Sequence, residues 1–239
     1  MKRALVTGGS GGIGAAVCHR LAADGCQVFV HAHRNGAAAR ALAAAIAAGG
    51  GSAEVVAFDV TDAAATGTAL AALLAGGPVQ IVVNNAGIHD DAVFPAMRAK
   101  QWKDVVDVSL NGFFNVTQPL LMPMLRTRWG RIVNVTSVAA IAGNRGQVNY
   151  AAAKGALHSA TKSLALEVAS RGVTVNAVAP GIIATGMSEA AFDKEAIERM
   201  VPMKRAGKPD EVADLIGFLC SDQAAYITGQ IISINGGII

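Results

Sequence analysis

The sequence predicts an α/β fold in which one doubly wound parallel sheet is covered by helices on both faces. Strand-like and helix-like segments alternate along the whole chain without a linker between them. Hydrophobic residues make up 52% of the 239 residues and charged residues only 15%, which is typical of a sheet buried on both faces. The first strand also runs directly into a glycine-rich turn that opens a helix. We therefore expect a single domain over residues 1–239.

The overall composition argues against several functional classes. The formal net charge is +3 and the basic residues are scattered, so no nucleic-acid partner is expected. No apolar run reaches membrane-spanning length, and the chain begins at once with strand residues, so we expect neither a membrane segment nor a signal peptide. Its three cysteines form no CxxC pair, which favours a reduced, cytoplasmic compartment. The histidines and aspartates at strand ends lack metal-ligand spacing, so we expect no metal site at His31, His33, His89, Asp90 and Asp91.

Short apolar runs rich in β-branched residues predict the strands, and apolar residues at helical spacing predict the helices between them. In the first part of the chain, Gly25 ends one helix, the glycines at 49–51 end a second that is rich in alanine, and Asp62 is the expected N-cap of a third. The expected strands there are residues 2–7, 27–32, 54–59 and 79–83, and the expected helices are residues 13–24, 37–48 and 63–75.

The second part of the chain continues the alternation. Residues 101–126 form a long helical stretch that Pro119 and Pro123 are expected to interrupt. The segment 183–208 is expected to form a lid over the substrate rather than a partner helix, because apolar residues are sparse over residues 187–203 and Pro202 ends that stretch. The repeated strand–helix units imply right-handed crossovers, and ligands in such sheets bind beyond the carboxyl ends of the strands. The expected strands here are residues 131–136, 173–179 and 230–234, and the expected helices are residues 150–170 and 210–221.

The glycine-rich turn predicts a binding site for a pyrophosphate. Gly8, Gly12 and Gly14 follow the first strand, and from Ile13 apolar residues recur at helical spacing. A helix that begins there directs its free backbone N–H groups and the positive end of its dipole into the turn. A Cβ atom on the glycines would block the approach of the backbone to a ligand. A glycine turn alone is weak evidence, because a tight connection has the same composition, but its position after the first strand and before a helix favours nucleotide binding.

Residues at the ends of the next strands bear on the choice of cofactor. An acidic residue after the second strand would hold the adenosine ribose of NAD, but His33 and Arg34 stand there instead. Arg34 can pair with a 2′-phosphate, which favours NADPH over NADH; the alternative is a solvated surface arginine. Asp59 either accepts from the adenine amino group or is an ordinary cap. Residues 84–87 (Asn-Asn-Ala-Gly) either let a cofactor pass close to the backbone or form an asparagine-rich turn.

The strongest catalytic candidate is the group Ser137, Tyr150 and Lys154. Tyr150 and Lys154 are four residues apart and project from one face of the same helix, and Ser137 follows the fifth strand at the ligand edge. A tyrosine and a lysine four residues apart on a helix are common and usually not catalytic. The upstream serine and the glycine turn make a catalytic role the favoured interpretation here. A lysine ammonium near a phenol is expected to lower the pKa of Tyr150 toward neutrality. Ser137 would hold a substrate oxygen while Tyr150 gives it a proton and a nicotinamide delivers hydride.

Taken together, these motifs resemble the short-chain dehydrogenase/reductase family over nearly the whole chain. Within the family the sequence is most similar to the 3-oxoacyl-[acyl-carrier-protein] reductases and the acetoacetyl-CoA reductases, and it is also similar to members from polyene and polyketide-type clusters. The resemblance implies a Rossmann-type domain that reduces a 3-oxoacyl thioester, held on acyl carrier protein or CoA, with NADPH. The family motifs are residues 7–14, Asp59-Val60, residues 84–87, Ser137, Tyr150 with Lys154, and Pro180-Gly181 followed by Thr185; the closer match comes from residues 129–134, 144–150 and 232–237.

The resemblance also implies roles for individual residues. Ile183 and Thr185 would meet the nicotinamide carboxamide, and Lys154 would also hold the nicotinamide ribose. The family further implies a homotetramer with the last strand and the two long helices at its interfaces. The residues expected at the cofactor are Gly8, Ser10, Gly12, Ile13, Gly14, Arg34, Asp59, Val60, Asn85, Ala86, Gly87, Tyr150, Lys154, Pro180, Gly181, Ile183 and Thr185.

Two positions depart from the family pattern. An asparagine in the long helix before the fifth strand normally completes the catalytic group through a water relay, and Ser109 stands at its position. Asn111 is roughly 200° further around a helix and cannot replace it, so the relay would rely on the weaker hold of Ser109 on a water. Gly11 stands where many NADPH-using relatives have a basic residue, which leaves Arg34 as the main partner of the phosphate.

Partner binding and two other functions stay open at this point. Arg128 and Arg171 match family positions that dock the acidic carrier protein, and the alternative is that they are solubilising charges. The same three catalytic residues would also serve the oxidation of a sugar, polyol or steroid alcohol. A non-catalytic, cofactor-sensing or scaffold protein on the same fold is the alternative outside the enzymes.

Overall fold

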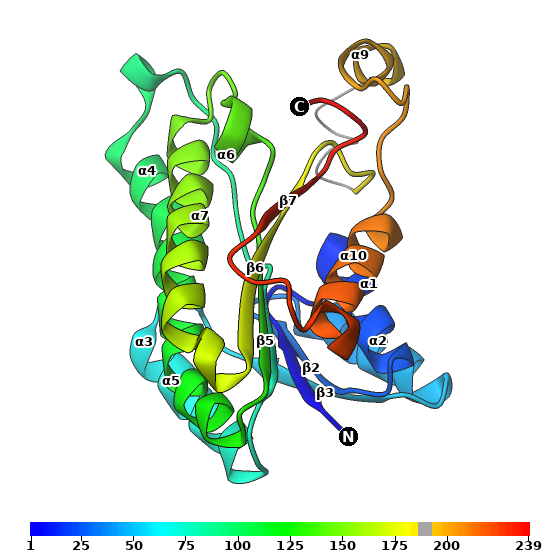
Figure 1. The fold of residues 1–239 in the computed structure, drawn as a ribbon. Helices are drawn as coiled ribbons and strands as arrows, with labels where there is room; N and C mark the ends of the chain where they lie inside the picture. Colours follow the sequence, from blue (N-terminus) through cyan, green and yellow to red (C-terminus); the bar gives the residue numbers. More distant parts are fainter. Residues whose placement is uncertain (186–192) are drawn as a thin grey trace.

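A single parallel sheet forms the centre of the computed structural model, which describes residues 1–185 and 193–239 (Figure 1). In that part of the chain seven strands pair in the order β3-β2-β1-β4-β5-β6-β7, and each pair is parallel. The strand order reverses between β1 and β4, which confirms the predicted doubly wound sheet. The strands are β1 (Arg3–Val6), β2 (Gln27–Ala32), β3 (Ser52–Ala57), β4 (Ile81–Asn84), β5 (Gly130–Val135), β6 (Val173–Pro180) and β7 (Ile231–Ile234).

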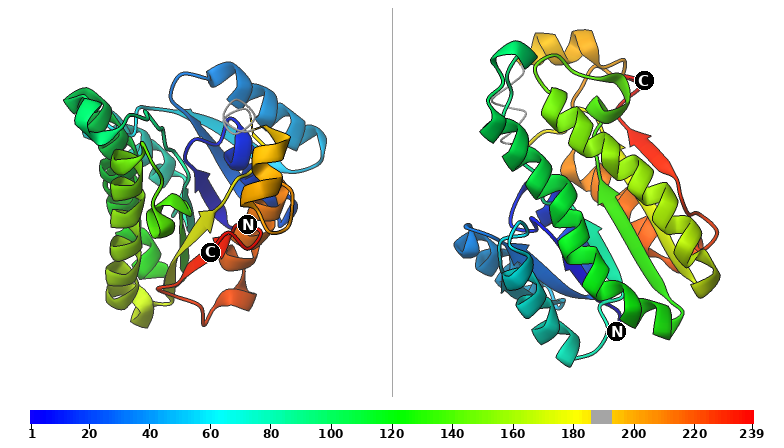
Figure 2. Two further views of the ribbon diagram at one scale, coloured as in Figure 1. Left: turned by 90° about the horizontal axis from the view of Figure 1, so that it is seen from above. Right: turned by 90° about the vertical axis from the view of Figure 1, so that its left-hand side faces the viewer.

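Helices cover both faces of the sheet. Those of the described residues are α1 (Gly12–Ala23), α2 (Gly36–Ala48), α3 (Ala63–Ala75), α4 (Ala99–Val106), α5 (Gly112–Thr127), α6 (Ala139–Ala142), α7 (Val148–Val168), α9 (Lys194–Met200) and α10 (Pro209–Cys220). Figures 1 and 2 show α1, α2 and α10 on one face and α3, α4, α5 and α7 on the other. The strands feed both layers in alternation: Phe29 packs into the core beneath α5, whereas Val28 and Val30 pack into the core beneath α1.

Local sequence explains the start of α3 but not the end of β3. Asp62 caps α3 as expected, because its side chain accepts a hydrogen bond from Ala65 N at 2.9 Å. The third strand ends two residues earlier than expected, at Ala57. Phe58 and Asp59 therefore belong to the loop at the carboxyl end of β3, where the ligand edge of the sheet lies.

The long helical stretch contradicts one expectation. Pro119 and Pro123 lie inside α5 and do not end it. The helical geometry changes earlier, where η2 (Asp107–Asn111) widens into a π turn between α4 and α5. A Cβ on Gly112, the first residue of α5, would lie 2.9 Å from Val60 Cγ2, so the chain here packs tightly against the loop after β3. Such π turns are frequent at functional sites.

A chain of buried amides and hydroxyls, which we call the polar seam, joins the sheet to α5 and α7. Asn84 Nδ2 donates to Thr117 Oγ1 and to Asn134 Oδ1, both at 2.9 Å. Asn134 Nδ2 in turn donates to Thr161 Oγ1 at 2.8 Å. All four side chains are buried. The polar seam therefore fixes both helices to the sheet beside Val135, the next residue of β5.

Other global features concern the part of the chain that the structure describes. There, none of the helices combines the length and the apolar character that a bilayer crossing demands. Over residues 1–185 and 193–239 no three His, Cys, Asp or Glu side chains gather as a metal site. Cys18, Cys26 and Cys220 are buried free thiols.

Candidate active site

The carboxyl ends of the strands line a cavity of about 720 Å³. Its walls come from the glycine turn, from the residues after β2, β3 and β4, and from α4 and η2. The cavity lies where the strand order reverses, the usual ligand position in such sheets. Thr7 joins the two strands at this point, because its Oγ1 accepts hydrogen bonds from Asn85 N and Ala86 N, each at 3.0 Å. The cavity is therefore built where the sequence analysis placed the ligand.

The glycine turn has the shape of a phosphate cradle. Gly8 has a φ of 61°, a conformation that favours glycine. A Cβ on Gly14 would lie 2.2 Å from Gly8 O, so α1 begins too close to the turn for any side chain there. Asn85 closes the turn from the other side, donating through Nδ2 to Gly8 O at 3.1 Å. The sequence placed Asn85 at the cofactor; the structure shows that its amide also holds the turn.

The residues after β2 and β3 form the opposite end of the cavity. Arg34 is exposed there, and His33 Nε2 lies 3.6 Å from Asp59 Oδ2. Asp59 Oδ1 accepts hydrogen bonds from Thr61 N at 2.9 Å and from Thr61 Oγ1 at 2.8 Å. Burial opposes ionisation of Asp59, but the Thr61 hydrogen bonds and the nearby positive charges outweigh it, so the pKa of Asp59 is lowered. Asp59 thus serves as a cap of its own loop through Oδ1, while its second oxygen lies near His33, just after β2.

The segment after β6 returns to the glycine turn. Gly181 N donates to the backbone of β7 at 2.9 Å, which holds the start of this segment. Ile183 is buried and pairs with Gly207 in an isolated parallel bridge. A Cβ placed on Gly12 would lie 3.5 Å from Thr185 Cγ2. Thr185 is therefore beside the glycine turn, as its expected contact with the cofactor requires.

The expected lid is described in part. In Figure 1, α9 stands beyond the carboxyl ends of the strands. Asp193 caps this helix by accepting from Ala196 N at 2.7 Å, and Met203 N donates to Gly236 O at 3.1 Å, which ties the end of the segment to the loop after β7. Residues 186–192 of the expected lid lie outside the described residues, so closure of the lid stays a prediction.

Ser137, Tyr150 and Lys154 come together at this edge. Ser137 lies two residues beyond β5, where its Oγ accepts a hydrogen bond from Ala139 N at 3.1 Å. Ser137 lies within side-chain hydrogen-bonding reach of Tyr150 and acts to lower the pKa of its phenol. Lys154, one turn further along α7, is buried, and its Nζ donates to Val135 O at 2.8 Å. That nitrogen lies 5.8 Å from the centre of the Tyr150 ring.

The pKa values of this group depart from the expectation. Burial raises the pKa of Tyr150, and the Asp91 carboxylate acts in the same direction, while the hydrogen bond with Ser137 offsets only part of the shift. The expected lowering by Lys154 does not appear in this geometry, because the ammonium donates to Val135 O and lies 5.8 Å from the centre of the phenol ring. Burial also lowers the pKa of Lys154 from 10.5 to about 8. At neutral pH the phenol is therefore protonated and the lysine is charged.

A buried amide that the sequence analysis missed anchors Tyr150. Asn149 is fully buried, and its Oδ1 accepts a hydrogen bond from Tyr150 N at 2.8 Å. Its Nδ2 donates to Asp90 O at 3.0 Å and to Gln101 O at 3.1 Å. Asn149 thus joins the first turn of α7 to the loop after β4 and to α4. The position of Asn149 directly before Tyr150 is the feature of the sequence that could have identified it.

Ser109 lies in the π turn with its side chain turned inward. The residue is buried, and within the described residues its Oγ has no hydrogen-bond partner. Asn111 is exposed and donates to Asp107 Oδ1 at 2.7 Å. Asn111 therefore does not take over the inward position, as the helical angle predicted. An unpaired buried hydroxyl in this place is suited to hold a water or a ligand group.

Arg128 and Arg171 lie at the opposite edge of the sheet from Tyr150. Arg128 comes just before β5 with a left-handed backbone, and Arg171 just before β6. Arg128 Nη2 donates to Ser170 O at 3.1 Å, so the two loops are in contact. Both arginines are exposed. They form a basic pair, but within one chain this pair is separated from the catalytic group by the length of the sheet.

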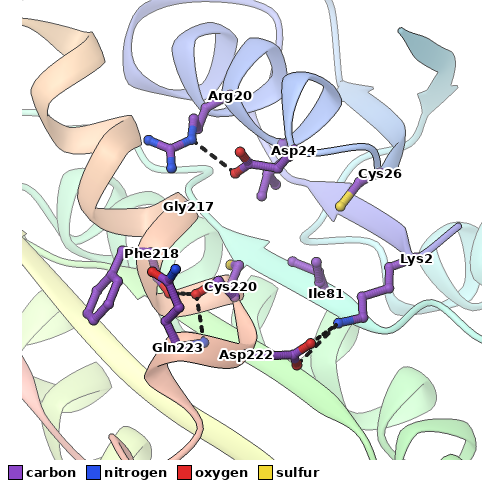
Figure 3. A pocket seen from close by; sticks show the side chains of 12 residues that line it. Lys2, Arg20, Asp24, Cys26, Ile81, Gly217, Phe218, Cys220, Asp222 and Gln223 are labelled. Atoms are coloured by element: carbon purple, nitrogen blue, oxygen red, sulfur yellow. Dashed lines mark hydrogen bonds and ion pairs between the residues drawn. The ribbon is translucent and has the colours of Figure 1, made fainter.

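A second cavity of about 520 Å³ lies at the amino edge, between the carboxyl ends of α1 and α10 (Figure 3). Its charges are already paired with one another: Lys2 with Asp222 at 3.3 Å and Arg20 with Asp24 at 3.0 Å. Burial raises the pKa of the Cys220 thiol at its wall, which leaves that thiol unreactive. The cavity at the carboxyl edge, with its glycine cradle, is therefore the functional candidate.

Comparison with known proteins agrees with this geometry. A family model described as "Enoyl-(Acyl carrier protein) reductase" matches residues 8–239. The 3-oxoacyl-[acyl-carrier-protein] reductase FabG of Aggregatibacter actinomycetemcomitans is 44% identical over 236 residues, 98% of each chain. FabG of Escherichia coli is 43% identical over 241 residues, covering 99% of this chain and 97% of its own. The acetoacetyl-CoA reductase of Allochromatium vinosum is 43% identical, covering 98% of this chain and 97% of its own. The chain therefore belongs to the short-chain dehydrogenase/reductase family of NAD(P)-dependent oxidoreductases.

Proposed function

We propose that this chain reduces a 3-oxoacyl thioester, carried on acyl carrier protein, to the 3-hydroxyacyl product, with NADPH as the reductant, in cytoplasmic fatty acid biosynthesis. The observation that carries the proposal is the hydroxyl pair of Ser137 and Tyr150 at the carboxyl edge, with Lys154 buried behind it. The full-length likeness to reductases of 3-oxoacyl thioesters supports the substrate class. The free state of the cysteines in the described residues supports the compartment.

The residues of the cavity fit a nicotinamide dinucleotide. The glycine cradle at Gly8 and Gly14 excludes side chains where the pyrophosphate would lie. Arg34 is exposed at the adenosine end, and Thr185 is beside the glycine turn at the other side. When bound, the dinucleotide supplies the hydride. Lys154 would hold its nicotinamide ribose.

In the reaction, the hydroxyl of Ser137 holds the ketone oxygen and the phenol of Tyr150 gives that oxygen a proton. The raised pKa of Tyr150 suits this direction, because a proton donor must be protonated at working pH. Lys154 keeps a positive charge beside the developing phenolate at neutral pH. We further propose that the unpaired hydroxyl of Ser109 holds a water that returns a proton towards the lysine.

Initial rates test the function directly. We expect turnover of 3-oxoacyl groups of several chain lengths on acyl carrier protein, slower turnover of acetoacetyl-CoA, and none of a polyol and sugar-alcohol panel. Each substrate is assayed with both dinucleotides by absorbance at the nicotinamide band. Preferred oxidation of a polyol, or binding of dinucleotide without any carbonyl turnover, contradicts the proposal.

The preference for NADPH rests on Arg34. We expect Arg34→Ala to lower kcat/KM with NADPH by about 10- to 100-fold, because a charge-assisted contact with the 2′-phosphate is lost. The value with NADH should stay within about twofold, because NADH has no such phosphate. The matched control is Arg126→Ala, an exposed arginine at the end of α5. Equal losses with both dinucleotides would show that Arg34 does not select the cofactor.

We propose that Arg128 and Arg171 dock the carrier protein. Exchanging both for Glu is expected to raise KM for carrier-bound substrate by about tenfold or more, with a change under about twofold for CoA-bound substrate, because an acidic partner is repelled. Arg40→Glu with Lys162→Glu makes the same charge change at exposed positions elsewhere. Steady-state rates at two salt concentrations measure the effect. If the double substitution lowered the rates with carrier-bound and CoA-bound substrate equally, Arg128 and Arg171 would not dock the carrier protein.

We also propose a homotetramer, as the family implies. The outer surfaces of α5 and α7 support it, because large apolar side chains are exposed there. Phe114 and Met122 on α5 and Leu166 on α7 are 63%, 55% and 85% exposed. Exposed apolar area of this kind marks protein–protein contacts. A mass measurement in solution that returns a single chain contradicts the assignment.

A further inference from the structure

One buried side chain at the cofactor cavity has no role in the function proposed above. His31 in β2 is 2% exposed and lines the cavity. Its Nδ1 accepts a hydrogen bond from Gly8 N at 3.0 Å, and its Nε2 lies 3.0 Å from Phe58 O. Its backbone carbonyl accepts a further bond from Gly9 N at 2.8 Å. A single residue thus contacts the glycine turn twice and the loop after β3 once.

The partners of His31 fix the protonation state of its ring. Gly8 N–H can only donate, so Nδ1 must carry no proton, and Phe58 O can only accept, so Nε2 must carry one. Only the neutral imidazole satisfies both partners. A proton on Nδ1 would face the N–H of Gly8 and leave two buried donors without an acceptor. Burial lowers the pKa of His31, and this favours the neutral form.

We propose that His31 is a positioning residue for the dinucleotide. In its neutral form it holds Gly8 in the left-handed conformation of the phosphate cradle and fixes Phe58, whose ring lies 4.1 Å from the imidazole, beside Asp59 at the adenosine end. The same side chain therefore couples the two ends of the binding site. Because acid removes the acceptor for Gly8 N–H, dinucleotide affinity falls when His31 becomes protonated. The inference rests on the proposed use of a dinucleotide at this cavity.

Few other charges face this imidazole. On β2 and after β3 they are His33, Arg34 and Asp59, and His33 is paired with Asp59. The glycine turn itself has no ionisable side chain. Across the cavity, α4 and η2 contribute two ion pairs, Lys100–Asp104 and Lys103–Asp107. Of these groups only His33 is also a histidine, so the control substitution is made at His33.

Affinity for NADP⁺, measured by calorimetry at several pH values from 5.5 to 7.5, tests the proposal. At pH 7.5, His31→Leu is expected to weaken binding by about tenfold or more, because Gly8 N–H loses its acceptor. His31→Asn retains an oxygen near the position of Nδ1, and its affinity is expected to stay within about threefold of the native value. From pH 7.5 to 5.5 the affinity of the native protein for NADP⁺ should fall relative to that of His31→Asn, whose acceptor does not titrate. Titration of the ligand phosphate is the same for both proteins and cancels.

The control His33→Asn should retain the native pH dependence of NADP⁺ affinity. Nitrogen chemical shifts of the histidine rings in the ligand-free protein should show a bare Nδ1 and a protonated Nε2 for His31 at pH 7.5, a readout independent of ligand. Loss of the pH dependence in His33→Asn, a native pH dependence in His31→Asn, or the other tautomer overturns the role of His31. A lowered melting temperature of His31→Leu with unchanged affinity also overturns it. If the native protein binds neither NADP⁺ nor NAD⁺, the proposed function itself fails, and this inference with it.

Discussion

Replacing Tyr150 by Phe is expected to lower kcat for carbonyl reduction by about 10²- to 10⁴-fold, the usual contribution of a positioned proton donor. The substitution removes one oxygen atom and leaves the aromatic ring in place. The interaction of the phenol with Ser137 is lost, but Tyr150 N still donates to Asn149 Oδ1, so the start of α7 stays anchored. We therefore expect affinity for the dinucleotide and the melting temperature to change little. Single-turnover rates and a calorimetric titration measure the two effects separately.

The chain offers a matched control for this substitution. Tyr226 is fully exposed, and Tyr226→Phe removes the same hydroxyl far from the cavity. Its kcat should equal the native value. If Tyr150→Phe retained native turnover, the phenol would not be the proton donor, and the catalytic scheme proposed here would fall.

Lys154→Met is expected to abolish most activity and, unusually for a buried position, to stabilise the fold at neutral pH. The folded state lowers the pKa of Lys154 from 10.5 to about 8, so between these values the unfolded chain binds one more proton than the folded one. Native stability therefore rises with pH across this window, and below pH 8 the buried ammonium lowers the free energy of unfolding by about 3 kcal/mol. Methionine removes this cost but leaves Val135 O without its donor, which costs about 1–2 kcal/mol.

Urea unfolding at a series of pH values measures this effect. We expect Lys154→Met to be more stable than the native chain by about 1–2 kcal/mol at pH 7. The difference in unfolding free energy between Lys154→Met and the native chain should shrink by about 1.4 kcal/mol for each pH unit above 8. The reason is that the native chain becomes more stable as Lys154 loses its proton, and the variant has no such group. The control Lys162→Met, an exposed lysine two turns further along α7, should show neither the stabilisation nor the slope. A pH-independent difference for Lys154→Met would mean that the ammonium is not destabilised in the folded state.

Alternating patterns of apolar residues were enough to predict the sheet and most helices. The strand over residues 27–32 and the helix over residues 63–75 agree with β2 and α3 at both ends. The prediction of a break at Pro119 and Pro123 was wrong, because those prolines are accommodated inside α5. What interrupts the helical stretch is a π turn, and directly after it Gly112 packs closely against Val60 from a distant loop. The spacing of apolar residues along one segment does not reveal such a tertiary contact.

For the site, spacing on a helix placed Tyr150 and Lys154 together with Ser137, and the structure shows that grouping. The direction of the Tyr150 pKa shift could not be predicted, because it depends on burial and on the distance between the phenol and the ammonium. His31 was considered only as a metal ligand and set aside. Its contacts with Gly8 and Phe58 join three segments, so only the folded chain shows them.

The polar seam allows α7 only one position along the sheet. An apolar helix face can slide along a sheet by one turn, about 5.4 Å, and still find apolar neighbours. Here such a slip would leave the amide of Asn134 and the hydroxyl of Thr161 buried without their hydrogen-bond partners, which costs about 1–3 kcal/mol for each unpaired group. Competing registers of the helix are thereby disfavoured, and the native one is separated from them by an energy gap. The alignment of Tyr150 with the sheet is thus specified by residues that never meet a substrate.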